Sequence, residues 1–196
     1  MGFSIVSSIK RTIIAILLST ISFVIGFFIG SIEFVNSGVP PSSSLGFLGE
    51  LARFFKPYTI MTVIFIYLKN ALAVFTIWLL GAIFMIPSLW GLGFNGYIIG
   101  YTTTFVAVKY SLTFALASTL PHGILEIPAI ILAGAAGAEL GLSIIQKILS
   151  LFRQSSHSIK AGLKSSFRFV QVSLILLIPA AIIETYITPL IMSYFL

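Results

Sequence analysis

Long apolar runs separated by short polar interruptions dominate this chain. The runs cover about residues 12–32, 59–86, 96–108, 124–150 and 169–195. A hydrocarbon core of about 30 Å corresponds to roughly 20 apolar residues in one helical crossing. The pattern therefore predicts an all-α, polytopic transmembrane helix bundle with five crossings, formed by residues 1–196 as a single domain.

Two shorter segments do not fit the crossing pattern. Residues 111–119 form a nine-residue apolar piece that Leu120-Pro121-His122-Gly123 ends. We predict a re-entrant or broken half-helix here, because irregular backbone at membrane depth survives only where protein or water covers it. Residues 45–56 carry apolar side chains at helical spacing between charged ones. This predicts a short helix lying in the membrane interface, with an ordinary surface helix as the alternative.

Composition supports a membrane protein. Hydrophobic residues make up 58% and charged residues 8% of the 196 residues, and the mean hydropathy is +1.13. A soluble domain carries about 25% charged residues, so this chain lacks the polar surface that a water-exposed globule requires. Crossings also leave no room for a soluble catalytic domain. The absence of cysteine excludes disulfides and thiolate chemistry.

Basic residues predict the orientation. The net charge of +6 indicates retention on the cytoplasmic side of a membrane rather than nucleic-acid binding. Lys10 and Arg11 place the N-terminus inside, and the basic segment 153–168 is expected to be a cytoplasmic loop. Both ends of the intervening chain then face the cytoplasm, which requires an even number of crossings. The four spans between them meet this requirement if residues 111–119 re-enter rather than cross. We expect a multi-pass cell-membrane protein with an external C-terminus, and a first run that is a retained span rather than a signal peptide.

Polar side chains inside the apolar runs are the candidate functional residues, because ionisable groups at membrane depth are costly. His122 and Glu126 lie four residues apart, on one helical face, and Glu184 lies within the last span. Such a set could bind a metal, relay a proton or form structural hydrogen bonds. The whole predicted polar cluster is His122, Glu126, Glu184, Asn70, Lys69, Asn95 and Glu139. No cofactor is expected, and His122, Glu126 and Glu184 are only weak metal candidates.

Small residues recur at intervals of four in two of the runs. Gly96 and Gly100 form one such stripe, and Ala133, Gly137 and Gly141 belong to another. Small side chains let two helix backbones approach closely. We predict that these positions pack helices, either within the chain or across a homodimer.

At these residues the chain resembles the stage II sporulation protein M family of polytopic membrane proteins. The shared motifs are Lys69-Asn70-Ala71, Gly93-Phe-Asn-Gly96, Leu120-Pro-His-Gly-Ile-Leu-Glu-Ile-Pro-Ala129 with the small residues after it, and Ile183-Glu-Thr-Tyr-Ile-Thr-Pro189. They cover about residues 60–190. Lys69 is a departure, since family members often carry asparagine there. The resemblance implies the fold and these motif residues. The family's namesake is thought to recruit cell-wall-degrading partners as a membrane scaffold during engulfment.

Three functions are consistent with this pattern. The leading interpretation is a membrane scaffold or assembly factor, with the lipid bilayer, a second copy, or membrane or extracellular proteins as partners, and no nucleic acid. The alternative is a proton-coupled or small-solute transporter, because a broken helix beside buried ionisable residues is typical of transport sites. An intramembrane metalloprotease is the least favoured, since catalytic zinc requires three protein ligands and an open position.

Overall fold

The computed structural model describes residues 2–37, 56–152 and 159–195, and these are helical throughout apart from short connections. The helices are α1 (Gly2–Ser37), α3 (Ile60–Leu80), α4 (Ile86–Lys109), α5 (Leu112–Phe152) and α6 (Ile159–Ile182). A π-helical turn, η1 (Ile183–Ile187), and α7 (Thr188–Met192) continue α6 without a break. The predicted all-α fold is confirmed for these residues.

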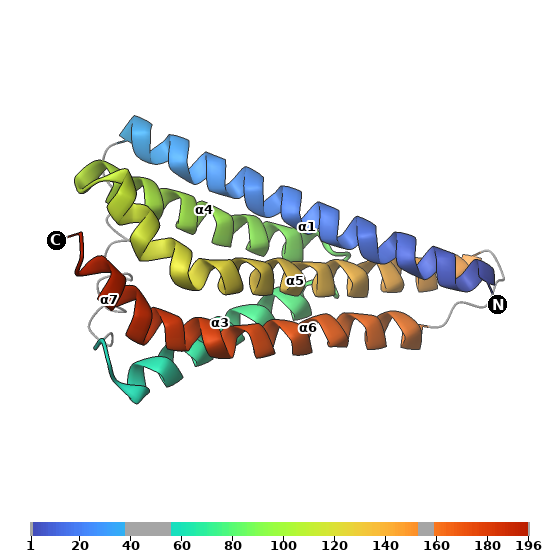
Figure 1. The fold of residues 1–196 in the computed structure, drawn as a ribbon. Helices are drawn as coiled ribbons and strands as arrows, with labels where there is room; N and C mark the ends of the chain where they lie inside the picture. The colour runs from blue at the N-terminus through green and yellow to red at the C-terminus, as the bar shows by residue number, and fades with distance from the viewer. Residues whose placement is uncertain (1, 38–55, 153–158, 196) are drawn as a thin grey trace.

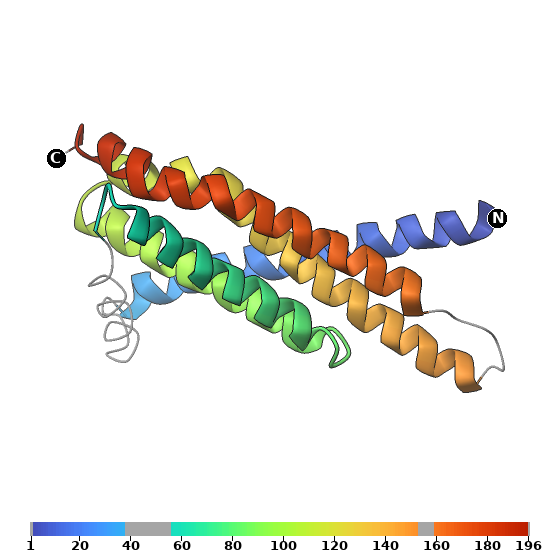
Figure 2. The same ribbon diagram turned by 90° about the horizontal axis from the view of Figure 1, so that it is seen from below.

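The helices form an elongated bundle in which successive helices run in opposite directions (Figure 1). The start of α1, the end of α5 and the start of α6 lie at one end, which we call the basic end because Lys10, Lys147 and Lys160 lie there. The C-terminus lies at the opposite end, and Figure 2 shows the same separation from a second side. The turn between α3 and α4 lies part-way along the bundle rather than at its tip.

Four helices are long and apolar enough to cross a membrane: Lys10–Ser37, Ile60–Leu80, Leu112–Phe152 and Ile159–Met192. The chain is therefore a multi-pass membrane protein. The fifth long helix, α4, is less apolar and packs against α1, α3 and α5. The count of five crossings consequently stays a prediction.

Backbone-to-backbone contacts hold α1 against α4. A Cβ atom built on Gly96 would overlap the carbonyl of Phe23, and one on Gly100 would overlap the carbonyl of Phe27. Gly26 of α1 meets the backbone of α4 in the same way. The missing side chains therefore let two helices touch along several turns, so the first predicted stripe packs helices within the chain.

The second stripe lies on α5 and faces the α3–α4 hairpin. A Cβ on Gly137 would meet Ser88, and one on Gly141 would meet the backbone of Gly81 and Met85. Ala133 is fully buried. It belongs to an apolar core shared by α1, α3, α4, α5 and α6, whose buried members are Phe23, Val74, Ile77, Leu92, Ala129, Ile130, Ala133, Ala136, Val170 and Leu177.

The break between the second and third runs is displaced from its predicted position. The predicted runs 59–86 and 96–108 leave it between residues 86 and 96, whereas α3 ends at Leu80 and the turn has left-handed backbone at Phe84 (φ 53°) and Met85 (φ 62°). Pro87 lies in the first turn of α4, where a backbone N–H has no acceptor within the helix. The missing N–H of proline therefore costs no hydrogen bond there. Gly93 and Gly96 are helical because their contact with α1 outweighs the low helix propensity of glycine.

The predicted half-helix at 111–119 is wrong in the structure. Those residues and the expected span 124–150 belong to one helix, α5, of 41 residues. At about 1.5 Å per residue it is roughly 60 Å long. Pro121 and Pro128 lie inside it, and its first part bends away from the bundle axis (Figure 1). Neighbouring groups can satisfy backbone atoms that a proline frees within a membrane helix, so the proline kinks α5 without ending it.

Two further predictions concern the polar connections. The proposed interfacial helix at 45–56 lies outside the described residues except for Lys56. The basic segment 153–168, expected as a loop, is helical from Ile159 onward, and residues 153–158 lie outside the described part. Lys160, Lys164 and Arg168 therefore stand on the first turns of α6.

Candidate functional site

Three ionisable side chains from α5 and η1 converge in the half of the bundle away from the basic end. His122 and Glu126 lie on successive turns of α5, and Glu184 projects from η1. One ligand atom from each lies within 4.8 Å of the others, and His122 Nε2 is 3.9 Å from Glu126 Oε2. The side chains of His122 and Glu126 are 16% and 14% exposed. We call these three residues the His–Glu–Glu cluster.

Thr188 orients the histidine. Its Oγ1 lies 3.3 Å from His122 Nδ1, and Thr188 is buried. With Nδ1 bonded to this hydroxyl, Nε2 is the ring nitrogen that faces Glu126. Thr188 was not among the predicted residues, although its spacing of four from Glu184 within the last helix was a usable signal.

The π-helical turn that carries Glu184 has a cause in the sequence. Pro189 has no N–H, so the carbonyl of Thr185 lacks its ordinary donor four residues later. The N–H of Tyr58, just before α3, donates to that carbonyl at 3.2 Å. The N–H of Thr188 bonds instead to the carbonyl of Ile183, five residues back. Single π-helical turns of this kind occur often at functional sites.

Lys69 and Asn70 of α3 have different environments. Lys69 is exposed and close enough to interact electrostatically with His122 and Glu184. Asn70 is 4% exposed and buried within the bundle. The lysine thus borders the His–Glu–Glu cluster from the surface, while its neighbour is buried in the bundle.

Glu139 belongs to a second polar site near the basic end. Its side chain is fully buried, and Arg11 Nε and Nη2 each lie 2.8 Å from its Oε1. Arg11 Nη1 donates to Gln146 at 3.1 Å, and Glu139 Oε2 has no hydrogen-bond partner among the described residues. Thirteen residues, about 20 Å of helix, separate Glu139 from Glu126. The single polar cluster that we predicted is therefore two sites.

Asn95 joins neither site. Its Nδ2 donates to the carbonyl of Gly91, one turn earlier in α4, at 2.8 Å. It satisfies its amide within its own helix, which removes it from the predicted cluster.

Mostly apolar side chains fill the bundle between the two polar sites, together with the buried hydroxyls of Ser19 and Ser88, which have no hydrogen-bond partner among the described residues. Along α5 this region contains Ala129, Ala133 and Ala136, buried against Leu92 and Leu177 among others. Two serines of α6 point into it, and both are engaged: Ser166 donates to the carbonyl of Ala136 at 2.7 Å and Ser173 to that of Ala129 at 2.8 Å. Their hydroxyls bond helix to helix.

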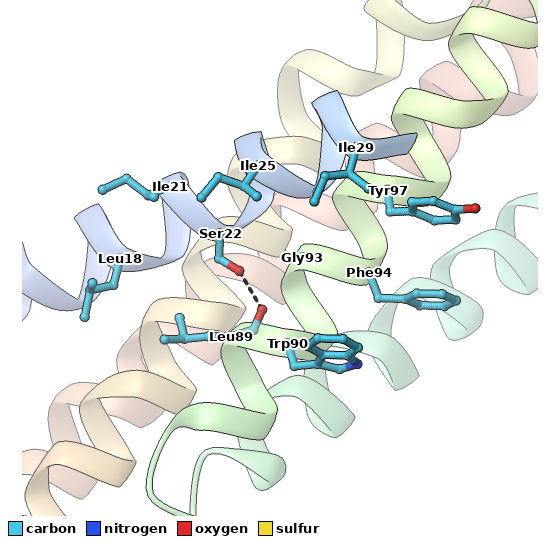
Figure 3. Close-up of a pocket in the computed structure, with 11 residues that line it drawn as sticks. Leu18, Ile21, Ser22, Ile25, Ile29, Leu89, Trp90, Gly93, Phe94 and Tyr97 are labelled. Carbon is cyan, nitrogen blue, oxygen red and sulfur yellow. Dashed lines mark hydrogen bonds between the residues drawn. The ribbon is translucent and has the colours of Figure 1, made fainter. Parts of the chain in front are cut away.

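A groove lies on the outer face between α1 and α4 (Figure 3). Its volume is about 390 Å³. At its base Ser22 Oγ donates to the carbonyl of Leu89 at 2.7 Å. Apolar and aromatic side chains make most of its walls, which are formed by Leu18, Ile21, Ser22, Ile25, Gly26, Ile29, Leu89, Trp90, Gly93, Phe94 and Tyr97.

Comparison with known proteins identifies the family. The family model of stage II sporulation protein M matches residues 13–189. The chain belongs to this family. The resemblance inferred from the motifs is confirmed, and the match also includes α1 from residue 13 onward, which those motifs did not cover.

Two relatives come from Methanocaldococcus jannaschii, and both are uncharacterized proteins. One is 31% identical over 113 residues, which are 58% of this chain and 51% of that protein. The other is 31% identical over 131 residues, 66% of this chain and 72% of that protein. The match thus spans about half the length of the first relative. No solved structure matches the chain.

In this member of the stage II sporulation protein M family, the two longest motifs meet in space. The segment Leu120–Ala129 supplies His122 and Glu126, and the segment Ile183–Pro189 supplies Glu184 and Thr188. The shorter Gly93–Gly96 motif lies against α1. The motifs therefore correspond to one polar site and one helix-packing contact.

Proposed function

We propose that this protein is an integral membrane scaffold or assembly factor that holds another membrane protein against its helices. The observation that supports this most is the apolar core between the two polar sites. Transport of a proton or solute requires a polar route through the bundle. Here about 20 Å of α5 between Glu126 and Glu139 is covered mainly by buried alanines and aliphatic side chains. Of the buried serines there, Ser166 and Ser173 bond to backbone carbonyls, and the hydroxyls of Ser19 and Ser88 lie against Gly134 and Gly137 with no partner among the described residues.

The groove between α1 and α4 is the proposed contact surface, with one transmembrane helix of a partner protein as its occupant. Trp90 is 79% exposed and Phe94 is 56% exposed along one wall. Aromatic residues are enriched in the cores of protein interfaces. The small residues Gly93 and Ser22 leave part of the groove without bulky side chains, which favours close approach of a second helix in lipid.

The proposed orientation follows the positive-inside rule. Basic side chains at the start of α1, the end of α5 and the first turns of α6 favour a cytoplasmic position for the basic end. The C-terminus and the His–Glu–Glu cluster then face the external side of the cell membrane.

Site-specific photo-crosslinking in native membranes tests the scaffold. A photoreactive residue would replace Trp90 or Phe94 in the groove, and Leu68 or Leu72 on α3 as matched lipid-exposed controls, which are 58% and 68% exposed. We expect one discrete protein adduct from both groove positions and none from the controls. A mass equal to two copies would identify a homodimer instead of a separate partner.

Two results would reject the proposal. The first is the same set of adducts from groove and control positions, which would mean that only lipid and chance neighbours contact the groove. The second is proton or solute flux in proteoliposomes of the pure protein that Glu126→Gln abolishes. That result would favour transport.

A further inference from the structure

We propose that His122, Glu126 and Glu184 bind one divalent transition-metal cation. The inference concerns a different surface from the groove and does not depend on the scaffold function. Its first basis is distance. Ligand atoms around a tetrahedral ion with bonds of about 2.0–2.2 Å lie roughly 3.3–3.6 Å apart, and here the three lie within 4.8 Å. Metal binding would draw the two glutamate side chains closer to the histidine by rotation about their own bonds.

The second basis is charge. Glu126 and Glu184 bring two carboxylates together inside an apolar bundle, where uncompensated charge is costly. Among the described residues, no lysine or arginine nitrogen lies within ion-pair distance of either carboxylate. Lys69 is near but exposed. One divalent cation would neutralise both carboxylates at once.

The third basis is the orientation of the histidine. Imidazole ligands in metal sites usually donate their second ring N–H to a neighbouring oxygen, which fixes the ring and the tautomer. Thr188 Oγ1 is such an oxygen, 3.3 Å from His122 Nδ1. In the tautomer in which Nδ1–H donates to this oxygen, the Nε2 lone pair is directed toward Glu126. The π-helical turn places Glu184 and Thr188 on the side of η1 and α7 that faces α5.

The donor set indicates the class of cation. One imidazole and two carboxylates suit Zn²⁺, Mn²⁺ or Fe²⁺, whereas Ca²⁺ and Mg²⁺ prefer oxygen ligands alone. The partial exposure of His122 and Glu126 leaves room for water as a further ligand. A bound ion would tie α5 to the last helix at the end of the bundle remote from the basic residues.

Metal titration of the full chain tests this site. The protein, purified in nanodiscs and stripped with a chelator, would be titrated with Zn²⁺ by calorimetry and with Co²⁺ by visible absorption. We expect one equivalent to bind, and His122→Ala or Glu184→Gln to weaken binding at least tenfold. His157→Ala, which changes the other histidine, and Glu33→Gln, which changes an exposed carboxylate, are matched controls and should bind as the wild type does.

Thr188 offers a second pair of variants that leaves all three ligands in place. Loss of an outer hydrogen bond to a metal ligand weakens affinity by about 10–100-fold. Thr188→Val should therefore bind Zn²⁺ more weakly, and Thr188→Ser, which keeps the hydroxyl, should not. Zn²⁺ should also raise the melting temperature of the wild type more than that of Thr188→Val.

The outcomes decide the inference even if His122→Ala does not fold. Folded wild-type protein that binds no Zn²⁺ or Co²⁺ would overturn it. So would binding that Glu184→Gln and Thr188→Val leave unchanged. A negative crosslinking result at the groove would remove the scaffold proposal and leave this site untouched.

Discussion

The buried ion pair between Arg11 and Glu139 offers the sharpest test of the packing. Its two members are not equivalent, because the side chain of Glu139 is 0% exposed while that of Arg11 is 10% exposed. Arg11 also keeps a second partner, Gln146. Replacing one member should therefore cost much more than replacing the other.

Arg11→Met leaves a carboxylate with no access to water and no cation. Removing one partner of a buried pair costs about 3–5 kcal/mol. Glu139→Leu leaves a guanidinium that retains Gln146 and can extend its long side chain toward the interface. The stability lost in Glu139→Leu should be closer to the value of one charged hydrogen bond, about 1.5–3 kcal/mol. The double variant should recover most of the stability lost in Arg11→Met, because an apolar pair removes the buried charge altogether.

Unfolding in mixed micelles by increasing SDS, followed by tryptophan fluorescence, measures these differences. Trp78 is a suitable reporter, since its Nε1 donates to Ser166 across two helices at 2.6 Å. Lys10→Met is the matched control, because Lys10 is exposed and its loss removes the same charge without a pair. Equal losses for Arg11→Met and Lys10→Met would refute the reasoning, as would a double variant less stable than Arg11→Met.

Three other predictions test the packing and the topology. Gly96→Leu should prevent α1 and α4 from closing and destabilise the protein by more than about 3 kcal/mol, whereas Gly91→Ala, whose added Cβ meets only side-chain atoms at 3.7 and 3.9 Å, should leave the melting temperature nearly unchanged. Ser173→Ala should cost about 0.6 kcal/mol, typical of one interhelical hydrogen bond in a membrane; a loss above 2 kcal/mol in the same SDS assay would contradict this. In this cysteine-free chain, Lys164→Cys and Tyr194→Cys should react with impermeant thiol reagents from opposite sides of the membrane, and labelling from one side would reject the topology.

The helical class and the approximate positions of the helices followed from hydrophobic runs, because lipid imposes nearly continuous apolar stretches. Positions governed by contacts between helices did not follow. Pro121 and Gly123 have the character of a break in the isolated sequence, yet both lie within α5. Gly93 and Gly96 likewise lie within α4 because α1 packs on them.

The candidate site could be predicted in part for a similar reason. His122 and Glu126 share one helical face, so their proximity depends only on helix geometry. Glu139 lies on the same helix, but distance along α5 and its pairing with Arg11 separate it from them. Thr188 was missed because its role depends on the π-helical turn, in which Tyr58 from outside the helix donates to the carbonyl of Thr185 that Pro189 leaves without a donor.

The position of the α3–α4 turn has a consequence for the reach of the molecule. Gly141 of α5 lies against Met85 in that turn, and α5 continues to Phe152, about 16 Å farther at 1.5 Å per residue. The start of α1 extends beyond Arg11 in the same direction (Figure 2). If the turn marks the bilayer surface, two helical arms rise from it into the headgroups and the water beyond. A chain with too few polar residues for a soluble domain thus still has helical ends outside the bilayer that a soluble partner can contact.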